Sequence, residues 1–153
     1  MAMTYGYIYV AQIAMGANDA HTLKAFLEAE AFDGPSLIIA YSHCISHGID
    51  MSKGLDQQKL AVQSGLWPLF RFNPQLIERG ENPLSLDSKA PSIDLDEYAY
   101  KEARYRMLLQ SNEERAEELM KKAKQDVQSR WELYTQMAAI RYSSGNGKKN
   151  SAE

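Results

Sequence analysis

The stretch YGYIYVAQIAMGANDAHTLKAFLEAEAFDGPSLIIAYS, residues 5–42, decides the fold because its apolar pattern changes period twice. Residues 5–14 are rich in Tyr, Ile and Val and carry no charge, which is typical of a strand buried on both faces. Residues 19–32 repeat apolar side chains at helical spacing, and residues 36–42 form a second apolar strand. A strand, a helix and a strand joined by short loops predict a right-handed βαβ unit with parallel strands.

The predicted helix has recognisable ends. Asn18 or Asp19 is suited to cap its first turn. Gly34 lies at the position where helices often end in a left-handed residue, and Pro35 beyond it cannot continue the helix. The apolar side chains at helical spacing are Leu23, Phe26, Leu27 and Ala31.

The chain after this unit is less regular. Residues 49–54 are predicted as a loop, and residues 55–64 as a short helix ended by Gly65. Residues 67–74 are predicted as a third strand, and residues 83–88 alternate as an edge strand does. These two strands could pair as a hairpin with a long loop.

From Asp94 onward the pattern is helical. The residues DLDE (94–97) match a capping box, with Asp94 as the N-cap of a helix that should extend to about Gln110. A second capping box, SNEE (111–114), opens a longer helix. One stripe of this helix is apolar and must be buried: Ala116, Leu119, Met120, Ala123, Val127, Trp131, Tyr134 and Ala138.

These patterns predict an α/β fold in three parts. Residues 1–92 form the parallel βαβ portion, and residues 93–141 form a helical C-terminal extension. Residues 142–153 are small and polar and are predicted to be a disordered tail.

Composition excludes several classes of function. The chain has 153 residues, of which 44% are hydrophobic and 24% charged, as in ordinary globular domains. A net charge of −3 gives no basic field for nucleic acid or an anionic membrane. No apolar stretch approaches the roughly 20 residues that span a bilayer, and the N-terminus lacks the pattern of a signal peptide. We expect a soluble cytoplasmic protein without nucleic-acid or membrane partners.

The only cysteine, Cys44, lies in SHCISHG between His43 and His47. Free cysteines are often buried for structural reasons. A nucleophile would need a base, and His47 is near, but no acidic residue that could orient it is close in sequence. Zinc would need further ligands, for which only His21, His43 and His47 are available. The fourth alternative is one thiolate of an iron–sulfur cluster completed by other parts of a larger polypeptide. Spacing alone leaves these alternatives open.

Longer stretches carry a family resemblance. MAMTYGYIYVAQIAMGAN, LKAFLEAEAFDGPSLIIAYSHCISHGI, LAVQSGLWPLFRFNP and NPLSLDSKAP resemble, in this order, the C-terminal part of pyruvate:ferredoxin (or flavodoxin) oxidoreductases. The resemblance covers about residues 1–140. It implies oxidative decarboxylation of pyruvate with coenzyme A to acetyl-CoA and CO2. It also implies thiamine diphosphate with Mg²⁺, and electrons passed through [4Fe–4S] clusters to ferredoxin or flavodoxin.

The resemblance assigns a role to Cys44. In the family, the cysteine of this segment is a ligand of the [4Fe–4S] cluster nearest the thiamine. Here that cysteine is Cys44, followed by Ile45, Ser46, His47, Gly48 and Ile49. His47 is the candidate to donate a hydrogen bond near the cluster. The other three cysteine ligands lie upstream in the family and have no counterpart in this chain.

The resemblance also shows what is missing. The family holds the diphosphate and Mg²⁺ through a G-D-G motif and a later asparagine-containing stretch, and neither occurs here. Residues 1–92 therefore resemble the C-terminal portion of a thiamine diphosphate-binding domain. We expect a fragment, a truncated product or a split subunit that carries no catalytic or cofactor-binding residues besides Cys44, binds no cofactor alone and is inactive alone.

Two functions follow as alternatives. The chain completes a homodimeric oxidoreductase together with the remainder of that enzyme, which acts on pyruvate and coenzyme A. Alternatively, it is a non-catalytic assembly module that packs on a partner through its helices at 94–140.

Overall fold

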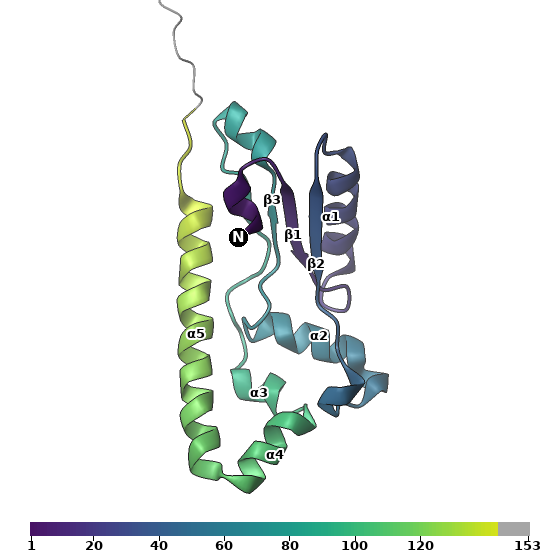
Figure 1. The fold of residues 1–153 in the computed structure, drawn as a ribbon, viewed down its shortest axis with the longest axis vertical. Helices are drawn as coiled ribbons and strands as arrows, with labels where there is room; N and C mark the ends of the chain where they lie inside the picture. Colours follow the sequence, from purple (N-terminus) through teal and green to yellow (C-terminus); the bar gives the residue numbers. More distant parts are fainter. Residues whose placement is uncertain (144–153) are drawn as a thin grey trace, which may run out of the picture.

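A computed structural model describes residues 1–143 and shows a mixed four-stranded sheet with helices on both faces (Figure 1). The strands are β1 (Tyr9–Ile13), β2 (Ser36–Ala40), β3 (Phe70–Phe72) and β4 (Leu84–Leu86), in the order β2-β1-β3-β4. β1 and β2 are parallel, whereas β3 is antiparallel to both β1 and β4. The predicted βαβ unit, the hairpin with a long loop and the α/β class are therefore confirmed.

The crossover helix α1 (Asp19–Ala31) begins where the sequence predicts. Asn18 caps it, because its Oδ1 atom accepts a hydrogen bond of 2.9 Å from the His21 amide. The predicted left-handed glycine cap is wrong, since Phe32 is the C-cap and is extended, and the φ of Gly34 is 156°. A φ of 156° lies far from the left-handed helical region near 57°, so Gly34 does not form that cap.

The two parallel strands differ in burial although both are apolar. β1 is buried at Tyr9, Val10, Ala11 and Ile13, as predicted. β2 is an edge strand, and its Leu37 and Ile39 side chains remain 41% and 37% exposed. The apolar stripe of α1 is also exposed, at 62% for Leu23, 52% for Phe26 and 57% for Leu27. Two apolar surfaces therefore lack a covering element within residues 1–143.

Side chains of β1 alternate between two cores. Tyr9, Ala11 and Ile13 pack with Ala25 of α1 on one face of the sheet. On the other face Val10 joins a cluster with Phe70, Phe72 and Leu84. The long helix α5 (Glu113–Ala139) runs beside this second face and covers it with Tyr134, Met137 and Ala138 (Figure 1). The helical extension therefore folds back over the sheet.

A third cluster joins the helices. It contains Ala61 of α2 (Gly54–Gln63), Leu95, Tyr98 and Ala99 of α3 (Leu95–Ala99), and Val127 of α5. The short helix predicted at 55–64 is thus confirmed within one residue. Of the predicted stripe on α5, Ala116 and Val127 are buried, whereas Leu119 is 39% exposed.

The helical extension corrects two predictions. The single helix predicted from Asp94 to about Gln110 is two helices, because α3 ends at Ala99 and α4 (Ala103–Ser111) begins after a break. The break turns the side chain of Glu102 inward. Asp94 is the N-cap of α3 as predicted, but its side chain makes no capping bond. The predicted cap of α5 is wrong, because the N-cap is Asn112 rather than Ser111.

Two predictions about the chain's division remain untested. Most of the predicted disordered tail, residues 142–153, lies outside the described residues. The boundary between residues 1–92 and 93–141 stays a prediction.

An ionic network anchors α1 to the sheet. Arg71 on β3 donates to both carboxylate oxygens of Asp87, at 3.0 and 2.8 Å, and also bonds Glu28 of α1. His21 Nε2 lies 3.1 Å from Asp87, and the Tyr9 hydroxyl donates to Glu28 at 3.0 Å. Burial alone would raise the pKa of Asp87, but hydrogen bonds from His21 and Arg71 hold it below its usual value.

We expect Asp87→Asn to lower the free energy of unfolding by about 2 kcal/mol at pH 7, because it removes one partner of a largely buried ion pair. A carboxylate with a lowered pKa in the folded state contributes stability above its unfolded pKa, and that stability is lost as the pH falls. The difference in the free energy of unfolding between the unsubstituted chain and Asp87→Asn should therefore disappear as the pH falls from about 5 to about 2. Urea unfolding across this range measures it, with the exposed Asp33→Asn as control. A gap that is constant with pH would contradict the ionic account.

Candidate functional site

Residues 41–48, called here the Cys44 segment, leave the carboxyl end of β2. The Tyr41 amide still bonds the Ile13 carbonyl at 2.9 Å, which extends the parallel pairing by one residue. Cys44 is extended and half-buried, and it precedes a short 3-10 turn, Ile45–His47. Gly48 closes the turn in a left-handed conformation with φ of 67°. Cys44 thus lies at the carboxyl edge of the parallel pair, where open α/β sheets place their ligands.

The side chain of His43 packs against α2. Its Nδ1 atom lies 3.3 Å from Gln58 Nε2, and Gln58 Oε1 accepts a hydrogen bond of 2.8 Å from the Gly16 amide. A Cβ atom at Gly54 would come within 2.4 Å of the His43 ring, so the ring packs directly on the first turn of α2. This histidine therefore fixes the start of the segment.

Glu102 is the residue that the sequence failed to indicate. It lies between α3 and α4, and its side chain is 1% exposed. One carboxylate oxygen accepts from the Tyr98 hydroxyl at 2.8 Å and from Gln57 Nε2 at 3.2 Å. The other accepts from Arg104 Nε and lies 3.7 Å from His47 Nδ1.

Glu102 raises the pKa values of its neighbours Arg104 and Tyr98. Burial alone would lower the pKa of Arg104, but the negative charge of Glu102 raises it above its usual value. Burial raises the pKa of Tyr98, and its hydrogen bonds with Tyr41 and Glu102 raise it further. Burial also raises the pKa of Tyr41. Both tyrosines therefore remain neutral hydroxyls at physiological pH.

The structure bears on the nucleophile hypothesis in two ways. His47 does have an acidic neighbour, because Glu102 lies beside it in space although the two residues are far apart in the sequence. However, the other ring nitrogen of His47 faces Arg104, with Nε2 lying 3.4 Å from Nη1. One ring nitrogen of His47 faces Glu102 and the other faces Arg104. The arrangement therefore does not favour His47 as a base for Cys44.

The histidines that the zinc alternative would need are engaged separately. His21 bonds Asp87, whereas His43 lies beside Gln58 of α2. Among residues 1–143 there is no group of three or more His, Cys, Asp or Glu side chains that could hold a metal ion. A [4Fe–4S] cluster takes four cysteine thiolates, and the whole sequence has one. The residues present therefore do not fit a complete cluster and could supply one ligand of it.

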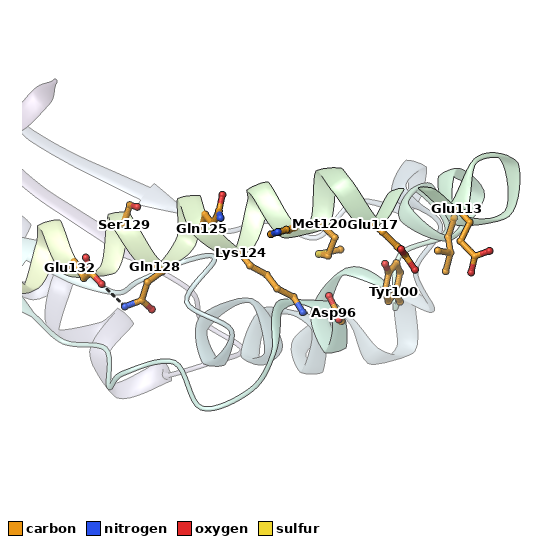
Figure 2. A pocket seen from close by; sticks show the side chains of 12 residues that line it. Asp96, Tyr100, Glu113, Glu117, Met120, Lys124, Gln125, Gln128, Ser129 and Glu132 are labelled. Carbon is orange, nitrogen blue, oxygen red and sulfur yellow. Dashed lines mark hydrogen bonds and ion pairs between the residues drawn. The ribbon is translucent and has the colours of Figure 1, made fainter. Parts of the chain in front are cut away.

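A groove between α3 and α5 lies apart from the Cys44 segment. Figure 2 shows its lining of mixed charge, in which Lys124 bonds Asp96 at 2.8 Å and Gln128 bonds Glu132 at 2.7 Å. Lys124 and Asp96 form an ion pair, whereas the bond between Gln128 and Glu132 joins a neutral amide to a carboxylate. The lining contains both lysines and carboxylates and indicates no particular ligand. Within the described part of the chain, no helix is both long enough and apolar enough to cross a membrane.

Comparison with known proteins defines what the chain resembles. No family model matches it. A pyruvate-flavodoxin oxidoreductase of Trichormus variabilis is 56% identical over 145 residues, which are 95% of this chain and 12% of that protein. The pyruvate:ferredoxin oxidoreductase of Moorella thermoacetica is 49% identical over 138 residues, 90% of this chain and 12% of its own length. A probable pyruvate-flavodoxin oxidoreductase of Escherichia coli is 47% identical over 136 residues, which are 89% of this chain and 12% of that protein.

The chain is thus an α/β segment, and it matches part of oxidoreductases that are much longer than it is. In particular, it matches a segment of the pyruvate-flavodoxin and pyruvate:ferredoxin oxidoreductases, and the resemblance seen in the sequence is confirmed. It spans about 12% of the length of these relatives.

Proposed function

We propose that this chain is part of a pyruvate:ferredoxin (or flavodoxin) oxidoreductase, in which the complete enzyme oxidatively decarboxylates pyruvate to acetyl-CoA and CO2. The observation that carries the proposal is the 56% identity over 95% of the chain, a matched stretch long enough to include Cys44. In this proposal residues 1–92 complete a thiamine diphosphate-binding domain, and residues 93–141 brace it. The thiamine diphosphate and Mg²⁺ site lies elsewhere in the enzyme.

Cys44 is proposed as one ligand of a [4Fe–4S] cluster. Its place at the carboxyl edge of the parallel pair supports this role, because cofactors bind at that edge. The half-buried thiol has access to a group brought by another segment. The cluster, when bound, supplies one-electron transfer away from the thiamine. This chain holds the sulfur in place, and His47 is proposed to shape the polar surroundings of the ligand.

The remainder of the enzyme is the proposed partner of the two uncovered apolar surfaces. On α1 the surface consists of Leu23, Phe26 and Leu27, each more than half exposed. On the sheet it consists of Leu37 and Ile39 of β2, an edge strand whose outer row of backbone groups has no partner strand within residues 1–143. Contiguous exposed apolar surfaces mark interfaces, and most of the relatives' length is available to cover them.

Finer features of the complete enzyme are also proposals. Ferredoxin or flavodoxin is the proposed electron acceptor, and a homodimer is the proposed assembly. The proposed location is the cytoplasm, where a reducing environment keeps ligand thiols free.

The assembly-module alternative is weaker. It requires the helices at 94–140 to pack on a partner, but α5 already packs Tyr134, Met137 and Ala138, each partly buried, against its own sheet. Within residues 1–143, part of the apolar face of α5 is therefore occupied, whereas Leu23, Phe26 and Leu27 of α1 stay more than half exposed.

A chimera tests the proposed function. This chain replaces the matching segment of the Trichormus variabilis oxidoreductase, and the product is assayed for pyruvate- and CoA-dependent reduction of a viologen dye. We expect the chimera to retain activity and the chain alone to show none, even with thiamine diphosphate and Mg²⁺. Turnover by the chain alone, or a folded chimera that binds thiamine diphosphate but does not turn over, would contradict the proposal.

A further inference from the structure

Two side chains, one on each side of Cys44 in the sequence, are connected to the carboxylate of Glu102. Tyr41 comes before the cysteine, and its hydroxyl shares a hydrogen bond of 2.8 Å with the hydroxyl of Tyr98, which donates to Glu102 at 2.8 Å. His47 comes after the cysteine, and its Nδ1 atom lies 3.7 Å from the other oxygen of Glu102. One buried carboxylate therefore connects to both ends of the Cys44 segment.

The backbone repeats this connection. The Ala103 amide donates to the Gly48 carbonyl at 3.1 Å, and a Cβ atom at Gly48 would lie 2.4 Å from the Ala103 Cβ. In an unbroken helix the Ala103 amide would bond a carbonyl four residues earlier and could not reach Gly48. The break between α3 and α4 therefore supplies both the free amide and the inward carboxylate.

The cost of burying Glu102 indicates that its contacts are specific. A buried carboxylate is strongly unfavourable unless hydrogen bonds and opposite charges satisfy it. Here Tyr98, Gln57 and Arg104 donate to it, from α3, α2 and α4 respectively. Such a network has one favourable arrangement, which suits it to hold a loop in a fixed position.

We propose that Glu102 is a positioning residue that fixes the Cys44 segment and thereby the place of the Cys44 sulfur. What the sulfur binds rests on the proposed function, whereas the positioning depends on this chain alone. The helical extension, through Glu102, then controls how the cysteine meets its ligand.

Hydrogen exchange in the 153-residue chain tests the positioning role. The His47 amide bonds the Cys44 carbonyl at 3.1 Å, and the Gly48 amide bonds the Ile45 carbonyl at 2.9 Å, so both report on the segment. Glu102→Gln keeps the side-chain size but removes the charge that Arg104 and His47 face. We expect these two amides to exchange at least about tenfold faster, while amides of β1 keep their rates. Glu97→Gln, on the exposed side of α3, is the matched control and should change neither set.

Other outcomes overturn the proposal. Exchange that accelerates equally in β1 and in the Cys44 segment would show that Glu102 only stabilises the fold. Unchanged exchange at His47 and Gly48 would show that the segment does not depend on Glu102. If Glu102→Gln fails to fold, Tyr41→Phe removes one hydroxyl at the end of the network. Local acceleration in that variant supports the proposal, and its absence overturns it.

A second readout separates this proposal from the proposed function. In the dithionite-reduced chimera, Glu102→Gln should shift the electron paramagnetic resonance signal of the reduced cluster while the iron content stays unchanged. An unshifted signal would overturn the positioning role at the cluster. If Cys44→Ser leaves the iron content intact while Glu102→Gln still accelerates local exchange, the ligand role fails and the positioning role stands.

Discussion

Replacing Gly48 by alanine is expected to lower the free energy of unfolding of the chain by about 3 kcal/mol or more. Two costs add at this position. The φ of 67° is unfavourable for any residue with a Cβ atom, by about 1 to 2 kcal/mol. The new Cβ would also lie 2.4 Å from the Ala103 Cβ, closer than any real contact, so α4 or the Cys44 segment must move.

Gly6 provides a matched control for this substitution. Its φ is 77°, and a Cβ atom there would have no heavy atom within 4 Å. Gly6→Ala therefore carries the backbone cost alone, about 1 to 2 kcal/mol. Urea unfolding of both variants measures the difference. Removing the opposing methyl group with Ala103→Gly should recover part of the loss in the Gly48→Ala variant but not in Gly6→Ala. Equal losses at the two glycines would show that the contact between Gly48 and Ala103 contributes little.

The central strands could be predicted from sequence because their signals are local. β1 is an uncharged run of apolar and aromatic residues, and Asn18 and Gly65 mark boundaries where the structure has them. The alternation at 83–88 correctly predicted β4 as an edge strand, but the pattern did not reveal that β2 lies at the other edge. β2 is as apolar as β1, but its exposure depends on what lies beside it in space, and residues 1–143 contain no covering element.

The helical extension shows a different limit. Residues 94–110 have a helical pattern throughout, and local propensity predicts one helix. The break at 100–102 arises from tertiary contacts, because the buried Glu102 bonds Tyr98, Gln57 and Arg104. A charged residue in a helical pattern is usually solvent-exposed. The sequence therefore contained no local signal for the most buried carboxylate of the site.

The cap of α5 was misplaced by one residue for a simple reason. Ser111 and Asn112 are both good N-cap residues, and the glutamate at 114 favoured Ser111 by the capping-box rule. In the structure Asn112 is extended, with φ of −158°, and its side chain accepts from the Arg115 amide at 3.0 Å. Ser111 instead ends α4 and donates to the Leu108 carbonyl.

Cys44 could be singled out from sequence, but its role could not be derived from spacing. The structure adds its position at the sheet's carboxyl edge and the Glu102 network beside it. Neither observation supplies the remaining ligands of a cluster, since the chain has one cysteine. The ligand role therefore remains a proposal that a single substitution can test.

In the chimera, Cys44→Ser is expected to damage one [4Fe–4S] cluster while thiamine diphosphate binding stays largely intact. A serine oxygen is a harder and more basic ligand than a thiolate, so the iron site that it would bind becomes labile or shifts in potential. Acetyl-CoA formation should slow strongly, because electrons leave the thiamine site slowly. His47→Ala should do much less harm, since His47 is not a proposed ligand.

The measurement that tests the central claim most directly is the iron content of the purified Cys44→Ser chimera, set against the unsubstituted chimera and His47→Ala. The proposed ligand role predicts a loss approaching the iron of one [4Fe–4S] unit in Cys44→Ser alone, with thiamine diphosphate still bound. A buried structural thiol predicts modest destabilisation and unchanged iron. Full iron occupancy with normal electron transfer in Cys44→Ser would contradict the ligand role.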